Sequence, residues 1–342
     1  MNRPLISICL PNRNTRPYLP ERIETIFAQT WSDWELVVSD NFSDDGAWEF
    51  LVGVAARDKR VSIIQNRLGM YDGWNDCIRR TRGDYVYIAT SDDTMAPDCL
   101  EKLVGALEKH PECDLAHCKL RVIDESGREL DHGWSRISLF ALSSGPLIDI
   151  PHVRMAPFDA LLLMSGRTVY WSITQLLIRR ELFDKIGFFE SRWGSVGDIN
   201  WQMRACLITN TVHVADTWAG WRVHPGQATG AIDYGSVEYE KRTREMIDHA
   251  IEATKALVSP KTFARLRRKW SRHALSLRHF LRQMSEKSSK TERRLFILQQ
   301  LLQGEFGASL HLRARGEKQP HWPEAARRWT FETGLTKALL PL

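Results

Sequence analysis

Two adjacent carboxylates, Asp92 and Asp93, end an apolar run that begins at Tyr85 and has the composition of one buried strand. Ligands of open α/β sheets bind at the carboxyl ends of such strands. Two neighbouring carboxylates repel each other, and a bound cation offsets that cost. The pair therefore predicts a site for a divalent metal ion that carries a phosphorylated ligand.

Further ionisable residues stand where other predicted elements begin or end. Asp40 ends an apolar run, Asp198 opens a helical pattern, and His224 ends a late strand. Any one of them alone is typical of a helix cap or a surface position. Their recurrence at strand ends is the signal, and hard carboxylate oxygens fit Mg²⁺ or Mn²⁺ better than zinc.

The elements that must hold these residues alternate between strand and helix patterns. This alternation predicts an α/β fold that is Rossmann-like, with a mostly parallel central sheet and flanking helices. The predicted strands are 5–10 (stopped by Pro11), 34–40, 61–64, 85–93, 115–123, 169–178, 211–214 and 218–224, and the predicted helices are 20–29, 69–80, 98–109, 180–186 and 198–207. The stretch 131–157 has an irregular pattern, and loops of that length are usually functional.

The chain changes character after Gly235, which predicts two parts: a domain over 1–235 and a basic, mainly helical C-terminal region over 236–342. The C-terminal region holds 22 Lys and Arg against 11 Asp and Glu, whereas the preceding part has a net charge of −6. Its apolar residues recur at helical spacing from Phe263 to Met284. A membrane surface or lipid phosphate would suit this region better than a nucleic acid. Packing on the domain or a homo-oligomer interface is the alternative.

The overall composition is that of an ordinary globular protein, with 43% hydrophobic and 26% charged residues. The six cysteines are scattered, and without a metal-type spacing they are expected to be reduced and buried. No run approaches about 18 apolar residues, so we expect neither a signal peptide nor a spanning helix. The expected location is cytoplasmic, with peripheral attachment to the inner membrane face as a further option.

Several of these stretches, in their order and spacing, resemble family 2 glycosyltransferases of the GT-A fold, over about residues 4–230. The matching stretches are 6–14, 34–45, 83–97, 186–189, 197–204 and 221–227. The resemblance implies a metal-dependent, inverting enzyme that moves a sugar from a nucleotide-diphosphate sugar to an acceptor hydroxyl. The expected cofactor is Mn²⁺ or Mg²⁺. A glycan or lipid-linked acceptor in surface polysaccharide assembly is expected.

The resemblance also implies roles for residues on the donor side. Asp40 is expected to hydrogen-bond the nucleotide base, in a pocket that Pro11 and Asn12 help to shape. Asn75 matches a helix position that supports the donor site, although core packing explains it equally well. Thr90 stands where the family motif usually has an acid that contacts the ribose, with Ser91 beside it.

Roles near the reacting atoms follow from the same resemblance. Asp92 matches the metal-binding acid of the Asp-x-Asp motif, with Asp93 next to it and His224 completing the metal or diphosphate site. Asp198 matches the general base that takes the proton from the acceptor hydroxyl.

Two alternatives stay open beside this interpretation. The missing acid at Thr90 is compatible with a catalytically inactive relative that binds nucleotide sugars or glycans. A nucleotidyltransferase would need a glycine-rich loop after the first strand, which Pro11–Asn14 lacks. Tryptophans 193, 201, 218 and 221 could stack on sugars, although most are expected in the core, and His117, His132 and His152 receive no role.

Overall fold

The computed structural model describes residues 4–130, 149, 151–164, 171–231, 236–267, 289, 291–292 and 339–341. The predicted helical stripe beyond residue 267 and most of the stretch 131–157 therefore lie outside the described residues. The strands are β1 (Ile6–Asn12), β2 (Trp34–Asp40), β3 (Val61–Gln65), β4 (Tyr85–Ile88), β5 (Thr94–Met95), β6 (Cys113–Ile123), β7 (His152–Arg154), β8 (Leu176–Arg179), β9 (Asn210–Arg222) and β10 (Leu339–Pro341). The α-helices are α1 (Leu19–Phe27), α2 (Ala47–Ala55), α3 (Met70–Arg80), α4 (Cys99–Lys109), α7 (Phe158–Met164), α8 (Glu181–Ile186), α9 (Gly197–Ile208), α10 (Val237–Ala253) and α11 (Pro260–Arg265). Short 3₁₀ helices are η2 (Ile173–Gln175), η3 (Ser191–Val196) and η4 (Ala228–Ala231).

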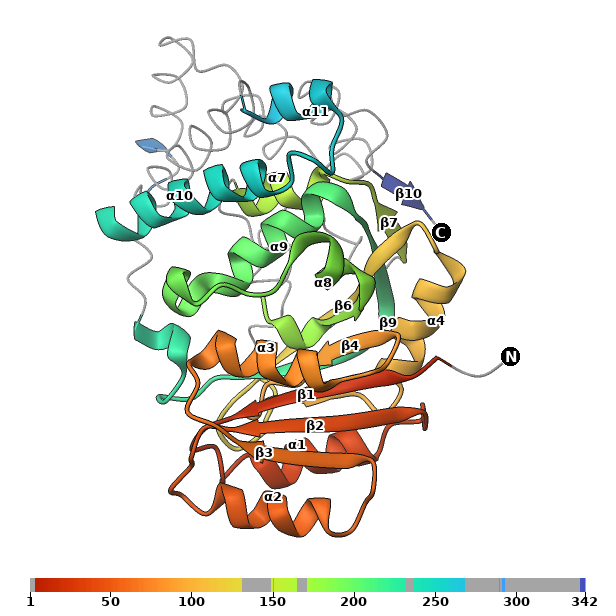
Figure 1. The fold of residues 1–342 in the computed structure, drawn as a ribbon, viewed down its shortest axis with the longest axis vertical. Coiled ribbons are helices and arrows are strands. Elements are labelled where there is room, and N and C mark those ends of the chain that lie inside the picture. Colours follow the sequence, from red (N-terminus) through yellow and green to blue (C-terminus); the bar gives the residue numbers. More distant parts are fainter. Residues whose placement is uncertain are drawn as a thin grey trace.

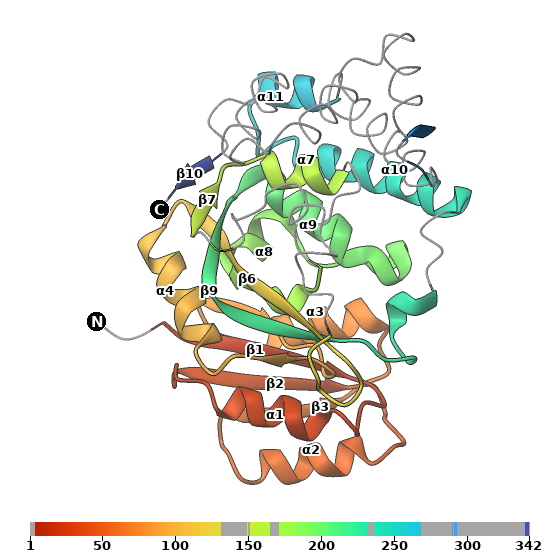
Figure 2. The ribbon, with the colours of Figure 1, turned by 180° about the vertical axis from the view of Figure 1, so that it is seen from behind.

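One sheet runs through the molecule in the order β10-β7-β9-β6-β8-β4-β1-β2-β3, with β5 paired to β9 (Figure 1). Strands β4, β1, β2 and β3 are parallel to one another, and β8 joins them to β6 in the antiparallel sense. The chain steps outward from β1 to β3 and then returns to β4. Because crossovers are right-handed, this reversal puts α1 and α3 on opposite faces of the parallel strands, as Figures 1 and 2 show. The crevice at the reversal lies between the ends of β1 and β4.

Pro11 does not stop the first strand, which continues to Asn12. Strand β4 pairs with β1 only as far as Cys9, where the amide of Ala89 donates to the Cys9 carbonyl at 2.7 Å. Asn12 turns its carbonyl the other way, to the amide of Asn41 at 2.9 Å. Backbone N–H and C=O groups of successive residues point to alternate sides of a strand, so the backbone groups of Pro11 point to the β4 side. Because β4 no longer pairs with β1 at this position, the missing N–H of Pro11 costs no hydrogen bond of the sheet.

Other predicted boundaries also differ from the structure. The predicted strand 169–178 is a short 3₁₀ turn, η2, followed by β8. Ser172 caps η2 because its hydroxyl accepts from Thr174 and Gln175 reaches back, so the apolar run is interrupted. The two predicted strands 211–214 and 218–224 form one strand, β9. Strand β7 lies inside the stretch predicted to be irregular.

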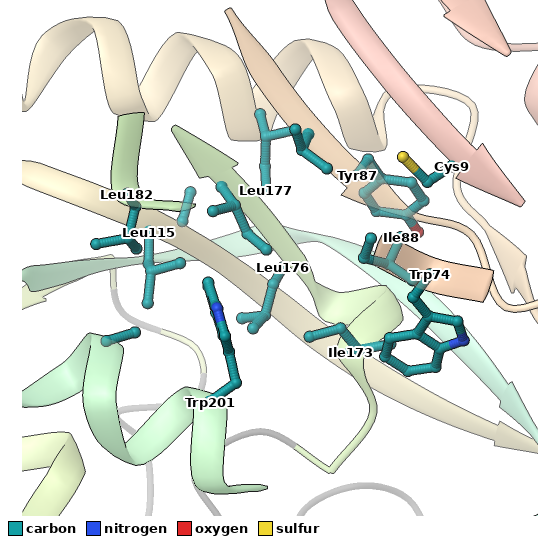
Figure 3. Close-up of a cluster of buried hydrophobic side chains, with 14 of the residues drawn as sticks. Cys9, Trp74, Tyr87, Ile88, Leu115, Ile173, Leu176, Leu177, Leu182 and Trp201 are labelled. Carbon is teal, nitrogen blue, oxygen red and sulfur yellow. The ribbon is translucent and has the colours of Figure 1, made fainter. Parts of the chain in front are cut away.

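The core lies between the sheet and the helices that include α3, α8 and α9. Figure 3 shows Tyr87 and Ile88 of β4 on one side of this cluster and Trp201 of α9 on the other. Trp201 is fully buried, so it belongs to the core and not to a sugar-binding surface. Helix α10 packs on α9, and the buried Asn200 donates to the Met246 carbonyl at 3.0 Å. Across the described part of the chain, no helix combines the length and apolar character needed to cross a membrane.

A buried polar cluster lies at the far end of β9. His152, His213 and His117 are in register across β7, β9 and β6, with ring centroids 5.0 and 4.6 Å apart. Arg154 donates to Asp159 and contacts the Nε2 atom of His117 at 2.5 Å. Burial lowers the pKa of His117 well below its ordinary value, and the charge of Arg154 lowers it further. These histidines are structural, as expected for His117 and His152; His132 lies outside the described residues.

Candidate active site

A cavity of about 460 Å³ opens at the crevice between the ends of β1 and β4. Its wall includes eight of the ten residues that the sequence singled out: Pro11, Asn12, Thr90, Ser91, Asp92, Asp93, Asp198 and His224. The topological reversal of an open sheet is the place where such folds bind ligands. Segments more than 200 residues apart in the chain therefore meet at one site.

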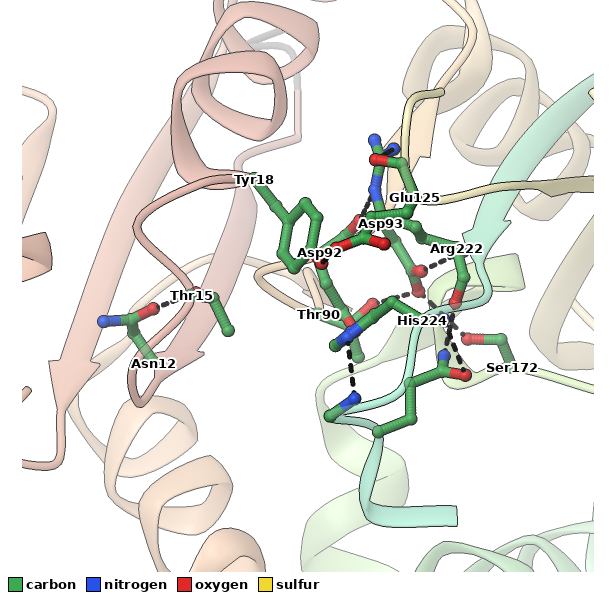
Figure 4. A network of polar contacts seen from close by, with 12 residues as sticks. Asn12, Thr15, Tyr18, Thr90, Asp92, Asp93, Glu125, Ser172, Arg222 and His224 are labelled. Carbon is green, nitrogen blue, oxygen red and sulfur yellow. Dashed lines mark hydrogen bonds and ion pairs between the residues drawn. The ribbon is translucent and has the colours of Figure 1, made fainter. Parts of the chain in front are cut away.

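Asp92 and His224 contact each other on the wall of this cavity. The Nε2 atom of His224 lies 3.0 Å from Oδ2 of Asp92, and the Tyr18 ring packs on the imidazole with centroids 4.7 Å apart (Figure 4). The Asp92 side chain is 21% exposed, so its carboxylate can be reached from the cavity. A carboxylate and an imidazole nitrogen thus converge at the wall.

Among the residues that the structure describes, no group of three or more His, Cys, Asp or Glu is arranged to hold a metal ion. The donor set nevertheless fits one that is completed by a ligand, because Mg²⁺ typically binds one or two carboxylates together with substrate phosphates and water. The cavity is lined by three carboxylates, which belong to Asp92, Asp93 and Asp198. Among the described residues of its wall, Arg13 is the single Lys or Arg. A diphosphate would meet an excess of negative charge there unless a cation came with it.

Asp93 differs from its neighbour because it is 2% exposed. Its Oδ1 accepts from the backbone amide of Arg222 at 2.9 Å, and its Oδ2 accepts from the hydroxyls of Thr90 and Ser172. Burial, followed by the charge of Asp92, raises the pKa of Asp93 to about 7. With both oxygens bonded inside the protein, Asp93 holds neighbouring segments together, and its place among the metal ligands stays a prediction. Thr90 likewise donates to Asp93 and keeps only oxygen lone pairs for a ligand.

Arg222 is a site residue to which sequence reasoning gave no role. Its side chain is 1% exposed, and its Nε donates to the Asp92 carbonyl at 2.7 Å. Nη1 donates to the carbonyls of Asp124 and Glu125 at 3.1 Å each, and Nη2 pairs with Glu21 at 2.5 Å. The guanidinium thus fixes the backbone that carries Asp92 (Figure 4). The sequence feature that could have pointed to Arg222 is its position two residues before His224.

Asp198 stands in the first turn of α9, where the helix N-terminus favours a negative charge. The Tyr71 hydroxyl donates to its Oδ1 at 2.8 Å. Burial raises the pKa of Asp198, and the hydrogen bond from Tyr71 acts in the opposite direction. A carboxylate with a raised pKa is a better proton acceptor near neutral pH.

Asp40 and Asn75 are not among the residues that line the cavity, and their roles at the donor site stay predictions. Asp40 is fully buried and accepts from Asn12 at 2.7 Å, from Ser43 and from Gln65, so it orients the Asn12 side chain. Asn75 bonds both backbone groups of Phe189, at 2.8 and 3.1 Å, and so ties α3 to the segment before η3.

Of the four tryptophans considered as sugar platforms, Trp221 alone lines the cavity. Trp171 lines it as well and meets Trp221 edge to face, with ring centroids 5.7 Å apart. Trp193 is buried, and Trp218 packs under Arg121 at 4.1 Å. The aromatic surface of the site therefore consists of Trp171 and Trp221 near its mouth, with Tyr71 and Trp74 deeper on α3.

The family model for glycosyl transferase family 2 matches residues 7–186. The putative glycosyltransferase EpsE of Bacillus subtilis is 33% identical over 127 residues, which is 36% of this chain and 46% of that protein. The chain spans about a quarter to a half of the length of the curated relatives that match it most strongly.

Two solved structures share the fold. TarS of Staphylococcus aureus, residues 1–349 in complex with UDP-GlcNAc, superposes with a TM-score of 0.60 at 15% identity, over 96% of this chain and 92% of that one. The mannosyltransferase PcManGT of Pyrobaculum calidifontis, in complex with GDP-Man and Mn²⁺, gives a TM-score of 0.51 at 18% identity, over 97% and 88%. These similarities confirm the expected GT-A fold.

Proposed function

Because the chain belongs to glycosyl transferase family 2, we propose that it transfers a sugar from a nucleoside diphosphate sugar to an acceptor hydroxyl, with inversion at the anomeric carbon. One observation carries the proposal: three side chains with suitable chemistry line the same cavity of about 460 Å³. Asp198 is a carboxylate that can act as a general base, and Asp92 and His224 are a pair that can bind a metal ion. That volume suits a nucleotide sugar, since small-molecule sites commonly measure roughly 300–1,000 Å³.

The proposed chemistry is a single displacement. Asp198 takes the proton of the acceptor hydroxyl while that oxygen attacks the anomeric carbon. The bond from this carbon to the diphosphate oxygen breaks, and its electron pair leaves with the nucleoside diphosphate. Attack from the side opposite to the leaving group inverts the anomeric centre. Holding both reactants in one cavity supplies much of the rate enhancement.

We propose that Asp92 and His224 hold Mn²⁺ or Mg²⁺ when the donor binds. The cation would neutralise the diphosphate and so stabilise the leaving group. The excess of carboxylates on the wall supports this assignment. The Mn²⁺ complex of the structural neighbour PcManGT supports it too, although that ion is known of PcManGT alone.

The donor side of the proposed site is formed by Pro11, Asn12, Thr90 and Ser91, which line the cavity at the ends of β1 and β4. Asp40 acts there through Asn12, whose amide it holds at 2.7 Å. We propose that the nucleoside binds against this group, with the Thr90 oxygen as an acceptor for a ribose hydroxyl.

For the acceptor we propose a glycan or a lipid-linked sugar in surface polysaccharide assembly. Trp171, which is 38% exposed, and Trp221 offer flat apolar faces at the cavity on which a sugar ring can pack. The net charge of +11 over residues 236–342 supports contact with an anionic membrane on the cytoplasmic side. Co-sedimentation with vesicles of neutral and anionic lipid tests that contact.

A donor screen tests the function. UDP-GlcNAc, UDP-glucose and GDP-mannose are each added with Mn²⁺, thermal stabilisation identifies the donor that binds, and release of the nucleoside diphosphate measures turnover. Asp198→Asn should lower turnover by about a hundredfold or more while donor binding persists. Asp92→Ala should weaken binding in Mn²⁺ but not in EDTA. Asp248→Asn, at an exposed position of α10, is the matched control.

The outcomes separate the alternatives. Binding of a donor by the wild-type protein without turnover would favour a catalytically inactive relative. Wild-type turnover by Asp198→Asn would refute the assignment of the base.

A further inference from the structure

Tyr71 joins the helix on the donor side of the cavity to the proposed base. It lies in the first turn of α3, and its hydroxyl donates a 2.8 Å hydrogen bond to Oδ1 of Asp198, at the start of α9. Both side chains line the cavity, although Tyr71 is only 2% exposed. Among the described residues, no other side chain donates a hydrogen bond to Asp198.

The Tyr71 ring is held in one place by its neighbours. Phe189 stacks on it with centroids 5.9 Å apart, and Trp74 meets it edge to face at 5.0 Å. A Cβ atom on Gly197 would lie 2.7 Å from Cε2 of Tyr71, so the ring packs directly on the backbone before Asp198. Asn75 fixes the Phe189 backbone in turn. A ring packed on several sides has one rotamer, and its hydroxyl therefore has one position.

Resting on the proposed function, we infer that Tyr71 is a positioning residue for the base: its hydroxyl fixes Oδ1 and so orients the carboxylate of Asp198 that takes the proton of the acceptor. A donated hydrogen bond favours the charged carboxylate. It therefore opposes the rise in the pKa of Asp198 that burial causes. Burial and the charge of Asp198 raise the pKa of Tyr71 well above its ordinary value, so the phenol keeps the proton that it donates.

Charged groups on the elements around Asp198 have other partners. Asp72 of α3 accepts from Ser191 at 2.8 Å, and Arg192 of η3 pairs with Glu190 at 2.6 Å. On α10, which packs on α9, His249 lies 3.3 Å from Glu190 and Arg242 lies 3.9 Å from Glu238. The remaining ionisable residues on the described cavity wall are Arg13, Asp92, Asp93 and His224. Tyr71 is thus the ionisable group in contact with the base.

The test is Tyr71→Phe, which removes one oxygen and keeps the ring. Without the hydrogen bond the carboxylate is more easily protonated, so the acid limb of the kcat–pH profile should move up by about one pH unit. We expect kcat to fall about tenfold, with KM for the donor within about twofold of wild type. The control is Tyr85→Phe, which deletes a phenol that bonds Glu108 and Arg179 away from the cavity. It should leave the profile in place.

A second measurement does not depend on turnover. With aspartate ¹³C-labelled at the side-chain carboxyl, the signal that Asp198→Asn removes reports the titration of Asp198. Its midpoint should rise by about one pH unit in Tyr71→Phe and stay unchanged in Tyr85→Phe. An unchanged midpoint in Tyr71→Phe would overturn the inference, even if Asp198→Asn abolishes turnover. An active Asp198→Asn enzyme would instead overturn the proposed function.

Discussion

Replacement of Arg222 tests whether the hydrogen bonds of one buried guanidinium hold Asp92 and His224 in place. Arg222→Met keeps an unbranched apolar stem and removes the four polar contacts of the guanidinium, which reach Glu21 and the carbonyls of Asp92, Asp124 and Glu125. Arg222→Lys keeps the charge but cannot form the planar fork.

The structure sets the size of the effect. Each carbonyl that loses its charged donor costs about 1 kcal/mol, so the three carbonyls make Arg222→Met about 3 kcal/mol less stable. The Glu21 side chain is 48% exposed, and the loss of its ion pair adds at most about 1 kcal/mol. Lysine can reach one of the carbonyls, so Arg222→Lys should lose about 2 kcal/mol. Because one of the carbonyls belongs to Asp92, both variants should bind Mn²⁺ with UDP about tenfold or more weakly.

Urea unfolding followed by tryptophan fluorescence measures the first effect, and calorimetry with Mn²⁺ and UDP measures the second. Arg128→Met is the matched control, because Arg128 is 83% exposed and water screens its ion pair with Asp124, so the stability should stay close to that of the wild type. An Arg222→Lys protein as stable as wild type, with unchanged UDP affinity, would show that charge alone suffices and would refute the fork argument.

Two further predictions concern stability. Gly197→Ala should lower the free energy of unfolding by about 2 kcal/mol, because the new Cβ would lie 2.7 Å from Tyr71 and 2.8 Å from the Glu190 carbonyl. Gly105→Ala, where nothing lies within 4 Å, should stabilise α4 by up to about 1 kcal/mol, and equal effects of the two in urea unfolding would contradict this reasoning. Burial lowers the pKa of His117 in the folded protein, so below about pH 6.5 the unfolded chain binds a proton that the folded protein does not, and stability should fall as the pH drops below that value. His117→Gln should lose correspondingly less between pH 7 and pH 5, and an identical loss in the two proteins would exclude His117 as the cause.

The sequence predicted the parts of the fold that depend on local patterns. Strand β2 was predicted with its observed bounds, and the cavity residues at the ends of β1 and β4 follow from the rule that parallel strands end at one edge. The roles of these residues stay predictions, although their convergence on one cavity is what the motif order implied.

The parts that failed depend on contacts distant in the chain. Tyr71 and Arg222 act through partners 127 and 130 residues away, and no spacing rule announces such pairs. The bonds that Asp40 accepts from Asn12 and Gln65 likewise come from neighbouring strands, and the sequence did not reveal them. The strand predicted over 169–178 failed because an apolar run does not reveal that Ser172 caps a 3₁₀ turn within it.

The proline at the end of β1 also limits the backbone hydrogen bonds that this part of the cavity wall can offer. On the side that β4 has left, Pro11 can offer its carbonyl oxygen but no amide hydrogen, and it lines the cavity. A group that bonds the backbone here must therefore supply the hydrogen itself, as the imide N–H of a pyrimidine or the ring N–H of guanine does. A ring nitrogen that carries only a lone pair would find no hydrogen-bond donor at the Pro11 backbone.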